Sequence, residues 1–119
     1  MSIRITCHGI TWGRDGFPTS IQEISALVFT GFEAFAFVVE DFGFDRLDDF
    51  KAALEKHRME LVALYGGGDL HLADRFEEMV AQNVRIARFL AANGADRLVL
   101  GPGRRPAGGP SRDDLVMER

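Results

Sequence analysis

The sequence has little of what marks several classes of protein. Its single cysteine, Cys7, permits no intramolecular disulfide, which fits a reducing compartment. The net charge is −4 and the longest basic run is the pair Arg104 and Arg105, so no nucleic-acid partner is expected. The N-terminus lacks an apolar stretch long enough for a signal peptide, and no window approaches a membrane span. These absences predict a cytoplasmic protein with no membrane partner.

Aromatic residues are unevenly chosen. The chain has 10 phenylalanines but 1 tryptophan and 1 tyrosine, a choice that suits a buried core better than a wet recognition surface. Of its 119 residues, 46% are hydrophobic and 27% are charged, which is typical of one soluble globular domain and excludes low-complexity disorder.

Apolar segments of two kinds alternate along the chain. Short runs rich in β-branched and aromatic residues predict strands over 3–7, 33–39, 59–65 and 96–101. Apolar residues at helical spacing predict helices over about 20–30, 45–58 and 74–93, with a fourth helix starting at 111. Strands that alternate with helices are parallel and are joined by right-handed crossovers. The chain is therefore predicted to be α/β, either an open doubly wound sheet or the first half of a (β/α)8 barrel.

Several of these segments carry an expectation about which side chains are buried. Ser20 and Glu23 form a capping-box pattern for the first helix. The helical period predicts two buried stripes: Ile21, Ile24, Leu27 and Val28 in 20–30, and Phe76, Val80, Ile86, Ala87 and Leu90 in 74–93. Segment 33–39 alternates Phe35, Phe37 and Val39 with Ala34, Ala36 and Val38, so both faces are apolar, as in a parallel strand covered on both sides. The alanine face is assigned to the interior of the barrel.

Glycine-rich loops raise the question of a phosphate site. The stretch "GGGDLH" at 66–71 has no following Lys-Ser/Thr pair and so is not a P-loop. In "GPGRRP", Gly101 and Gly103 have the spacing of a dinucleotide fingerprint, but Pro106 replaces the third glycine and no helix starts immediately afterwards. The doubly wound alternative therefore has little functional support, and a phosphate-binding, flavodoxin-like domain using loop 101–109 stays a weaker reading.

Polar residues gather after the predicted strand ends, where active sites of (β/α)8 barrels lie. The loops carry, in order, His8 and Trp12, then Glu40 and Asp41, then Tyr65, Asp69 and His71, then Arg104 and Arg105. His8 is either a structural histidine or a pocket residue, and Trp12 either plugs the barrel mouth or stacks on the apolar face of a sugar. Asp69 and His71 are too few to define a metal site.

Four stretches resemble a known family: "IRITCHGITWGRD", "GFEAF", "HRMELVAL" and "NVRIARFLAANGADRLVLGPG". Together they are similar to the N-terminal half of the xylose isomerase-like (β/α)8 barrels, which include sugar-phosphate isomerases and epimerases, inosose dehydratases and endonuclease IV. The histidine-rich signatures of endonuclease IV are missing here. The resemblance favours a metal-dependent sugar isomerase, epimerase or dehydratase.

The resemblance also implies a division of labour within the barrel. In that family a divalent metal (Mn, Co, Mg or Zn) is held by Glu, Asp and His side chains of the later strands, so no catalytic residue, metal ligand or bound metal is expected on this chain alone. Its expected share is the wall that faces a sugar or sugar-phosphate substrate: His8, Trp12, Glu40, Gly66, Gly67 and His71.

The chain as a whole is read as one partial barrel domain, 1–119, that stops within its fourth helix. Such a half-barrel is expected to be inactive alone and either to self-associate or to lack a C-terminal half. The alternative function is a non-catalytic half-barrel that serves binding or assembly.

Overall fold

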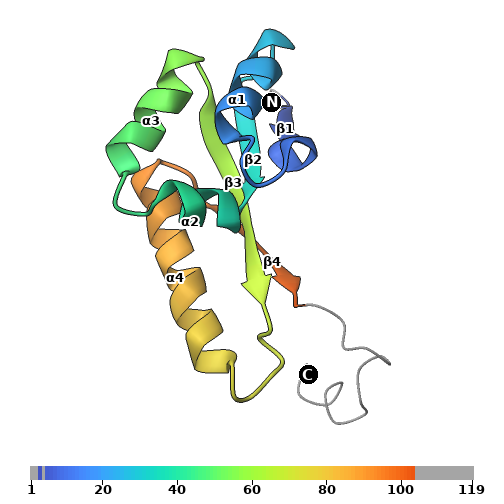
Figure 1. Ribbon diagram of the computed structural model, residues 1–119, viewed down its shortest axis with the longest axis vertical. Coiled ribbons are helices and arrows are strands. Elements are labelled where there is room, and N and C mark those ends of the chain that lie inside the picture. The colour runs from blue at the N-terminus through green and yellow to red at the C-terminus, as the bar shows by residue number, and fades with distance from the viewer. Residues whose placement is uncertain (1–2, 4, 104–119) are drawn as a thin grey trace.

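The computed structural model describes residue 3 and residues 5–103 (Figure 1). Its four strands are parallel, and they lie in the order β1-β2-β3-β4. The elements in chain order are β1 (Thr6–His8), the 3-10 helix η1 (Gly9–Trp12), α1 (Phe17–Ala26), β2 (Gly31–Phe35), α2 (Ala36–Phe42), α3 (Leu47–Lys56), β3 (Glu60–Gly68), α4 (Phe76–Ala92) and β4 (Arg97–Pro102). The predicted α/β class with parallel strands is confirmed.

The strand order decides between the two predicted architectures. Each strand is hydrogen-bonded to the strand that precedes it in the chain, so the sheet grows in one direction only. A doubly wound sheet reverses its strand order at a switch point, whereas a (β/α)8 barrel adds each strand beside the previous one. The four strands therefore form half of a barrel.

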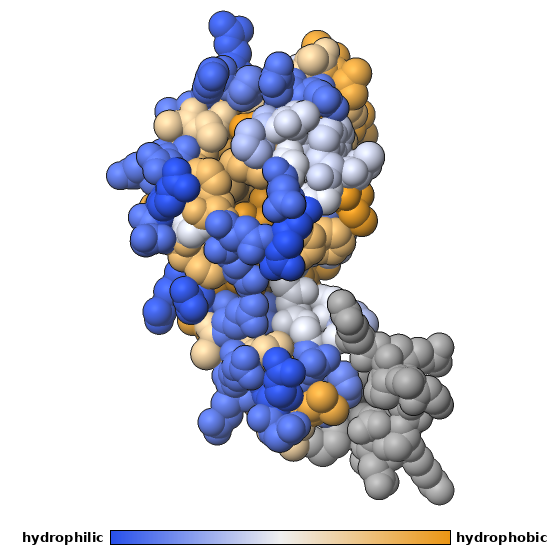
Figure 2. Space-filling model, viewed as in Figure 1, coloured by the Kyte–Doolittle hydropathy of each residue, from blue (hydrophilic) through white to orange (hydrophobic). Residues whose placement is uncertain are grey.

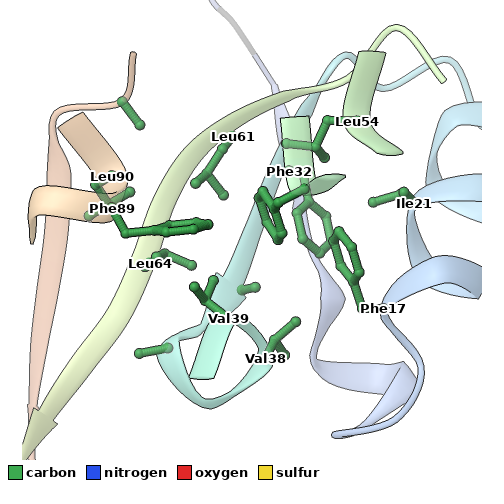
Figure 3. Close-up of a cluster of buried hydrophobic side chains, with 14 of the residues drawn as sticks. Phe17, Ile21, Phe32, Val38, Val39, Leu54, Leu61, Leu64, Phe89 and Leu90 are labelled. Atoms are coloured by element: carbon green, nitrogen blue, oxygen red, sulfur yellow. The ribbon is translucent and has the colours of Figure 1, made fainter. Parts of the chain in front are cut away.

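Phenylalanine rings make much of the core, between the helices and one face of the sheet. Phe50 of α3 is fully buried and stacks on Phe17 of α1, with ring centroids 4.8 Å apart. Its edges meet Phe42 at 5.5 Å and Phe89 of α4 at 5.1 Å. Figure 3 shows Phe17 and Phe32 pointing toward one another, from α1 and β2. The prediction that the phenylalanines serve a buried core is confirmed for this group.

Side chains alternate between two faces of the sheet, which differ in cover. The covered face carries Phe32, Ala34 and Leu64, all buried in the core cluster. The opposite face, here called the open face, leaves Tyr65 36% and Val99 37% exposed. It is formed by Thr6, His8, Glu33, Phe35, Tyr65 and Val99.

The predicted strand 33–39 is wrong in its second half. β2 ends at Phe35, and residues from Ala36 form α2, in which Ala36, Val38 and Val39 are buried. The face assignment is also wrong, because Ala34 lies on the covered face while Phe35 lies on the open face. A short run that is apolar on both faces fits a strand or a buried helical turn equally well, so its period does not separate the two.

The first helix starts earlier than predicted. α1 begins at Phe17, with Pro18 in its first turn, where the missing N–H costs nothing. Ser20 therefore lies inside the helix and its hydroxyl donates to the carbonyl of Phe17 at 2.8 Å, so the predicted capping box does not form. Leu27 and Val28 follow the helix end and are 62% and 92% exposed. Figure 2 shows apolar surface at this end of the molecule, near α1, and polar side chains over α3 and α4.

The long helix is found where predicted but is rotated about its axis. Ile86 and Leu90 of α4 are buried as expected, whereas Phe76, Val80 and Ala87 are exposed. Their places in the core are taken by Met79, Asn83 and Phe89. The helix has two possible apolar stripes. The stripe that contains Asn83 is the buried one, because the backbone N–H and carbonyl of Gly67 in β3 form hydrogen bonds with the Asn83 side-chain amide.

Candidate functional site

Three rings meet on the open face, at the carboxyl ends of β1 and β2 and in the second half of β3. His8, the last residue of β1, packs edge-on against Phe35 of β2 at 4.9 Å and against Tyr65 of β3 at 5.1 Å. Phe35 and Tyr65 are register partners, and their ring centroids are 6.0 Å apart. His8, Phe35 and Tyr65 are called the ring cluster below. Parallel strands bring them together because their carboxyl ends lie at one edge of the sheet.

His8 is held in an unusual polar environment. Its Nδ1 atom is buried and has no hydrogen-bond partner, the one such side-chain nitrogen or oxygen in the part of the chain described. Burial lowers the pKa of His8 below its ordinary value, and the nearby Glu33 carboxylate opposes that shift to a smaller extent. Glu33 is the register partner of His8 on β2 and accepts a hydrogen bond from the Thr6 hydroxyl. Burial of the ring and the missing acceptor at Nδ1 both favour the neutral imidazole over the charged form.

A second layer of side chains extends the ring cluster outward. Phe37 of α2 stacks on Phe35 with centroids 5.1 Å apart, and the Arg14 guanidinium lies 4.9 Å from the centroid of Phe37. Arg14 also donates to the carboxylate of Asp41, and both side chains are well exposed. This arginine therefore has its charge paired on the molecule itself.

Trp12 lies in η1, beside the start of α1. Its Nε1 donates to Glu23 Oε2 at 2.7 Å, and its half-buried ring packs against the core cluster. Glu23 was predicted to cap the helix, but its carboxylate accepts the hydrogen bond from the Trp12 indole instead. The indole N–H is already engaged, so only the ring face of Trp12 is available to a ligand.

Glu40 is directed toward the helices. It lies in α2 and accepts a hydrogen bond from Gln82 Nε2 of α4. With Phe44, Gln82 and Arg85 it lines a groove between α2 and α4. The structure places this predicted wall residue in the helical layer, away from the ring cluster.

Gly66 and Gly67 have clear packing reasons to be glycine. A Cβ on Gly66 would lie 2.4 Å from Asn83 Oδ1, and one on Gly67 would lie 1.9 Å from the carbonyl oxygen of Gly101. Gly67 has a φ of +107°, which favours glycine. The Asn83 amide bonds both backbone groups of Gly67, at 2.8 Å to its N–H and 2.9 Å to its carbonyl. These groups of Gly67 hold α4 against β3.

The loop after β3 carries His71, half-buried, two residues after Asp69. The Asp69 carboxylate pairs with Arg75 at 3.5 Å. Arg104, Arg105, loop 104–109 and the helix expected from 111 lie outside the described residues.

Of the six predicted wall residues, His8 belongs to the ring cluster. Its other members, Phe35 and Tyr65, are not among the predicted wall residues, because only the strand register shows that they adjoin His8.

The described residues do not fit a metal ion. Within 5–103, no group of three or more His, Cys, Asp or Glu side chains is placed to hold one. A divalent metal needs several such ligands with fixed geometry.

The same part of the chain has no helix that is both long and apolar enough to cross a membrane.

Comparison with known proteins gives structural matches. No family model matches the chain, and no curated protein sequence matches it either. The solved structure of 3-keto-D-glucoside 4-epimerase from E. coli is similar with a TM-score of 0.69 and 20% identity, over 98% of this chain and 48% of that one. A xylose isomerase domain protein from Planctomyces limnophilus is similar with a TM-score of 0.60 and 15% identity, over 82% of this chain and 40% of that one.

The chain thus spans about half the length of these two proteins, at 48% and 40% of their chains. At sequence identities of 20% and 15%, these matches show a shared fold, and they do not by themselves show a shared function. With four sequentially ordered parallel strands and helices packed on one face, the chain has the fold of half of a (β/α)8 barrel, and it is similar in fold to about half of each of these two structures.

Proposed function

We propose that this chain forms the sugar-binding wall of a barrel that isomerises or epimerises a sugar. The observation that carries the proposal is the ring cluster, which lies on the open face in the carboxyl-terminal halves of the first three strands. Active sites of (β/α)8 enzymes lie at that end of the barrel. Aromatic rings pack against the apolar C–H face of a sugar, while His8 and the Tyr65 hydroxyl offer polar contacts to its oxygens.

The structural neighbours support a sugar as the ligand class. One of them is a 3-keto-D-glucoside 4-epimerase, and the match to it covers 98% of the present chain. A keto sugar combines an apolar face with a carbonyl oxygen, and the ring cluster offers a surface for the first and a donor for the second. The substrate class proposed for this chain is therefore a keto sugar, with sugar phosphates as the alternative form. A cytoplasmic location remains part of the proposal, because the single cysteine fits a reducing compartment.

Catalytic groups are proposed to come from outside the described residues. A divalent metal of the kind expected for the family would supply charge stabilisation beside the reacting carbonyl. Within 5–103 no group of three or more possible ligands is placed together, so the chain alone is expected to bind sugar without turning it over.

The test is a titration of the full 119-residue chain, followed by nuclear magnetic resonance. Tyr65 is the one tyrosine of the sequence, so its ring resonances are assigned without ambiguity. Addition of a 3-keto-D-glucoside, or of D-fructose as a second probe, is expected to shift the Tyr65 ring resonances in a saturable way. Mixing with Mn, Co, Mg or Zn is expected to produce no turnover.

Two variants make the titration specific. Tyr65→Ala is expected to abolish the saturable shifts of the His8 resonances, whereas Phe76→Ala, which removes an exposed ring on α4, is expected to keep them. Sugar binding that is equally strong in Tyr65→Ala would contradict the proposed wall, as would the absence of any saturable shift in the unmodified chain.

A second candidate function is a non-catalytic assembly module. The observation in its favour is the open face, where Tyr65 and Val99 are each more than a third exposed, together with edge strands β1 and β4 that each have a single neighbour in the described sheet. Unpaired strand edges and exposed apolar faces promote association. Sedimentation of the chain at micromolar concentration tests it: a dimer that Val99→Lys converts to monomer, with no sugar binding by either, would favour this function over the first.

A further inference from the structure

We propose that His8 is a neutral hydrogen-bond donor with its proton on Nε2, aimed at an oxygen of the bound keto sugar. This inference rests on the proposed function, which it deepens by assigning a chemical task to one residue of the wall. It makes His8 the group that recognises the carbonyl, while Phe35 and Tyr65 provide the apolar surface.

The position of Nδ1 determines where the proton sits. A neutral imidazole has one N–H donor and one nitrogen acceptor, and the surroundings decide which nitrogen is which. Nδ1 of His8 is enclosed and has no partner in the described residues. A buried N–H without an acceptor is rarer and more costly than an unused lone pair. The proton is therefore placed on Nε2.

Nε2 is the nitrogen that a ligand reaches. Nδ1 alone of the two ring nitrogens is both buried and unpaired. The imidazole stands between Phe35 and Tyr65, which meet its ring at angles of 69° and 75°. These edge-on contacts fix the plane of the imidazole, and we infer that the nitrogen left available to a ligand is Nε2, because Nδ1 is the enclosed one. The donor is thus held in one orientation before a ligand arrives, which lowers the entropy cost of binding.

The charge of His8 follows from the groups that face it. These are the Thr6 hydroxyl on β1, the Glu33 carboxylate on β2 and the Tyr65 ring on β3. Protonation of the imidazole would create an N–H at Nδ1 with no acceptor, and burial of the ring lowers its pKa more than Glu33 raises it. A neutral donor polarises a sugar carbonyl without bringing a full positive charge into the site.

The first experiment measures the proton directly, without any ligand. Nitrogen-15 resonances of the imidazoles distinguish the Nε2–H tautomer, the Nδ1–H tautomer and the imidazolium ion. The chain has 3 histidines, and the signal that disappears in His8→Gln belongs to His8. At pH 7 the Nε2–H tautomer is expected. An Nδ1–H tautomer or an imidazolium ion would overturn the proposal.

The second experiment asks whether the donor matters for the sugar. A glutamine amide places an N–H near the position of Nε2, whereas phenylalanine keeps the ring shape and removes the donor. His8→Gln is expected to bind a 3-keto-D-glucoside within about threefold of the unmodified chain, and His8→Phe about tenfold more weakly, which is the net worth of one hydrogen bond. His57→Gln, at the end of α3, is the matched control and is expected to bind as the unmodified chain does.

The outcomes separate the two proposals. Equal affinity of His8→Phe and the unmodified chain would overturn the donor role while the sugar-binding wall stands. An Nε2–H tautomer in a chain that binds no sugar at all would overturn the proposed function, and the ligand assigned to the donor with it.

Discussion

The two faces of the sheet show how one set of strands serves two purposes. On the covered face, Phe32 and Leu64 are 1% and 0% exposed and lie against the helices. On the open face, His8, Glu33 and Tyr65 are partly exposed and carry the polar groups. Apolar burial is the main stabilising term in folding. We therefore expect the covered face to govern the free energy of unfolding, and the open face to govern binding.

The largest expected difference between the faces comes from removing one ring on each. Phe50→Ala empties the centre of the core, where Phe50 contacts Phe17, Phe42 and Phe89. Its cost is expected to be about 3–5 kcal/mol of unfolding free energy. Tyr65→Ala, on the open face, is expected to cost about 1 kcal/mol, because Tyr65 is 36% exposed. Urea unfolding of both variants decides it, and equal losses would show that the open face is also part of the core.

A smaller effect is expected where β3 and β4 meet. Gly67→Ala combines a positive φ with a Cβ only 1.9 Å from the Gly101 carbonyl oxygen, so the strands must separate. A loss of about 2–3 kcal/mol is expected. The matched control is Gly94→Ala, which also has a positive φ but meets nothing within 4 Å, and which is expected to cost about 1 kcal/mol. Thermal melts that rank the two variants in the opposite order would contradict the close approach of the strands.

The smallest effect is the dependence of stability on pH through His8. The pKa of His8 is lower in the folded chain than its ordinary value of 6.5, so the unfolded chain binds this proton more tightly. Stability should therefore fall as the pH drops below about 6.5 and level off above it. In His8→Gln this contribution is absent. The difference in urea midpoint between the unmodified chain and His8→Gln should therefore shrink toward acid pH. A difference that stays constant from pH 5 to pH 8 would show that burial does not shift the His8 pKa.

Much of the architecture could be read from the residue pattern. The predicted strand 96–101 lies within one residue of β4, and the predicted strand 59–65 covers the first part of β3, because each is an apolar, β-branched run. β3 continues to Gly68, so the glycines predicted as the start of a loop are part of the strand. The turn from β2 into α2 could not be read, since residues 36–39 are apolar on every side. The rotation of α4 also escaped prediction, because the choice of buried stripe depends on the backbone groups that Gly67 offers to Asn83.

The candidate site also has one residue that the sequence predicted and two that it did not. His8 was predicted because it follows directly on the first strand, and residues after strand ends meet at one edge of a parallel sheet. Phe35 and Tyr65 were not assigned to the wall, because their meeting depends on a register that includes an irregularity between Phe32 and Glu33. Glu40 was assigned to the wall because it was taken to follow a strand. In α2 its carboxylate lies instead within reach of Gln82.

By itself, the sequence determined the α/β class, the alternation of strands and helices, and the position of His8 at the carboxyl end of the first strand. These properties follow from local spacing and composition, which fix hydrophobic period and turn chemistry residue by residue. The tertiary structure alone decided the sequential strand order, the choice of buried face on α4, and the contact of His8 with Phe35 and Tyr65. Each of these depends on pairing between residues far apart in the chain, and a shift of one residue in strand register moves a side chain to the opposite face of the sheet.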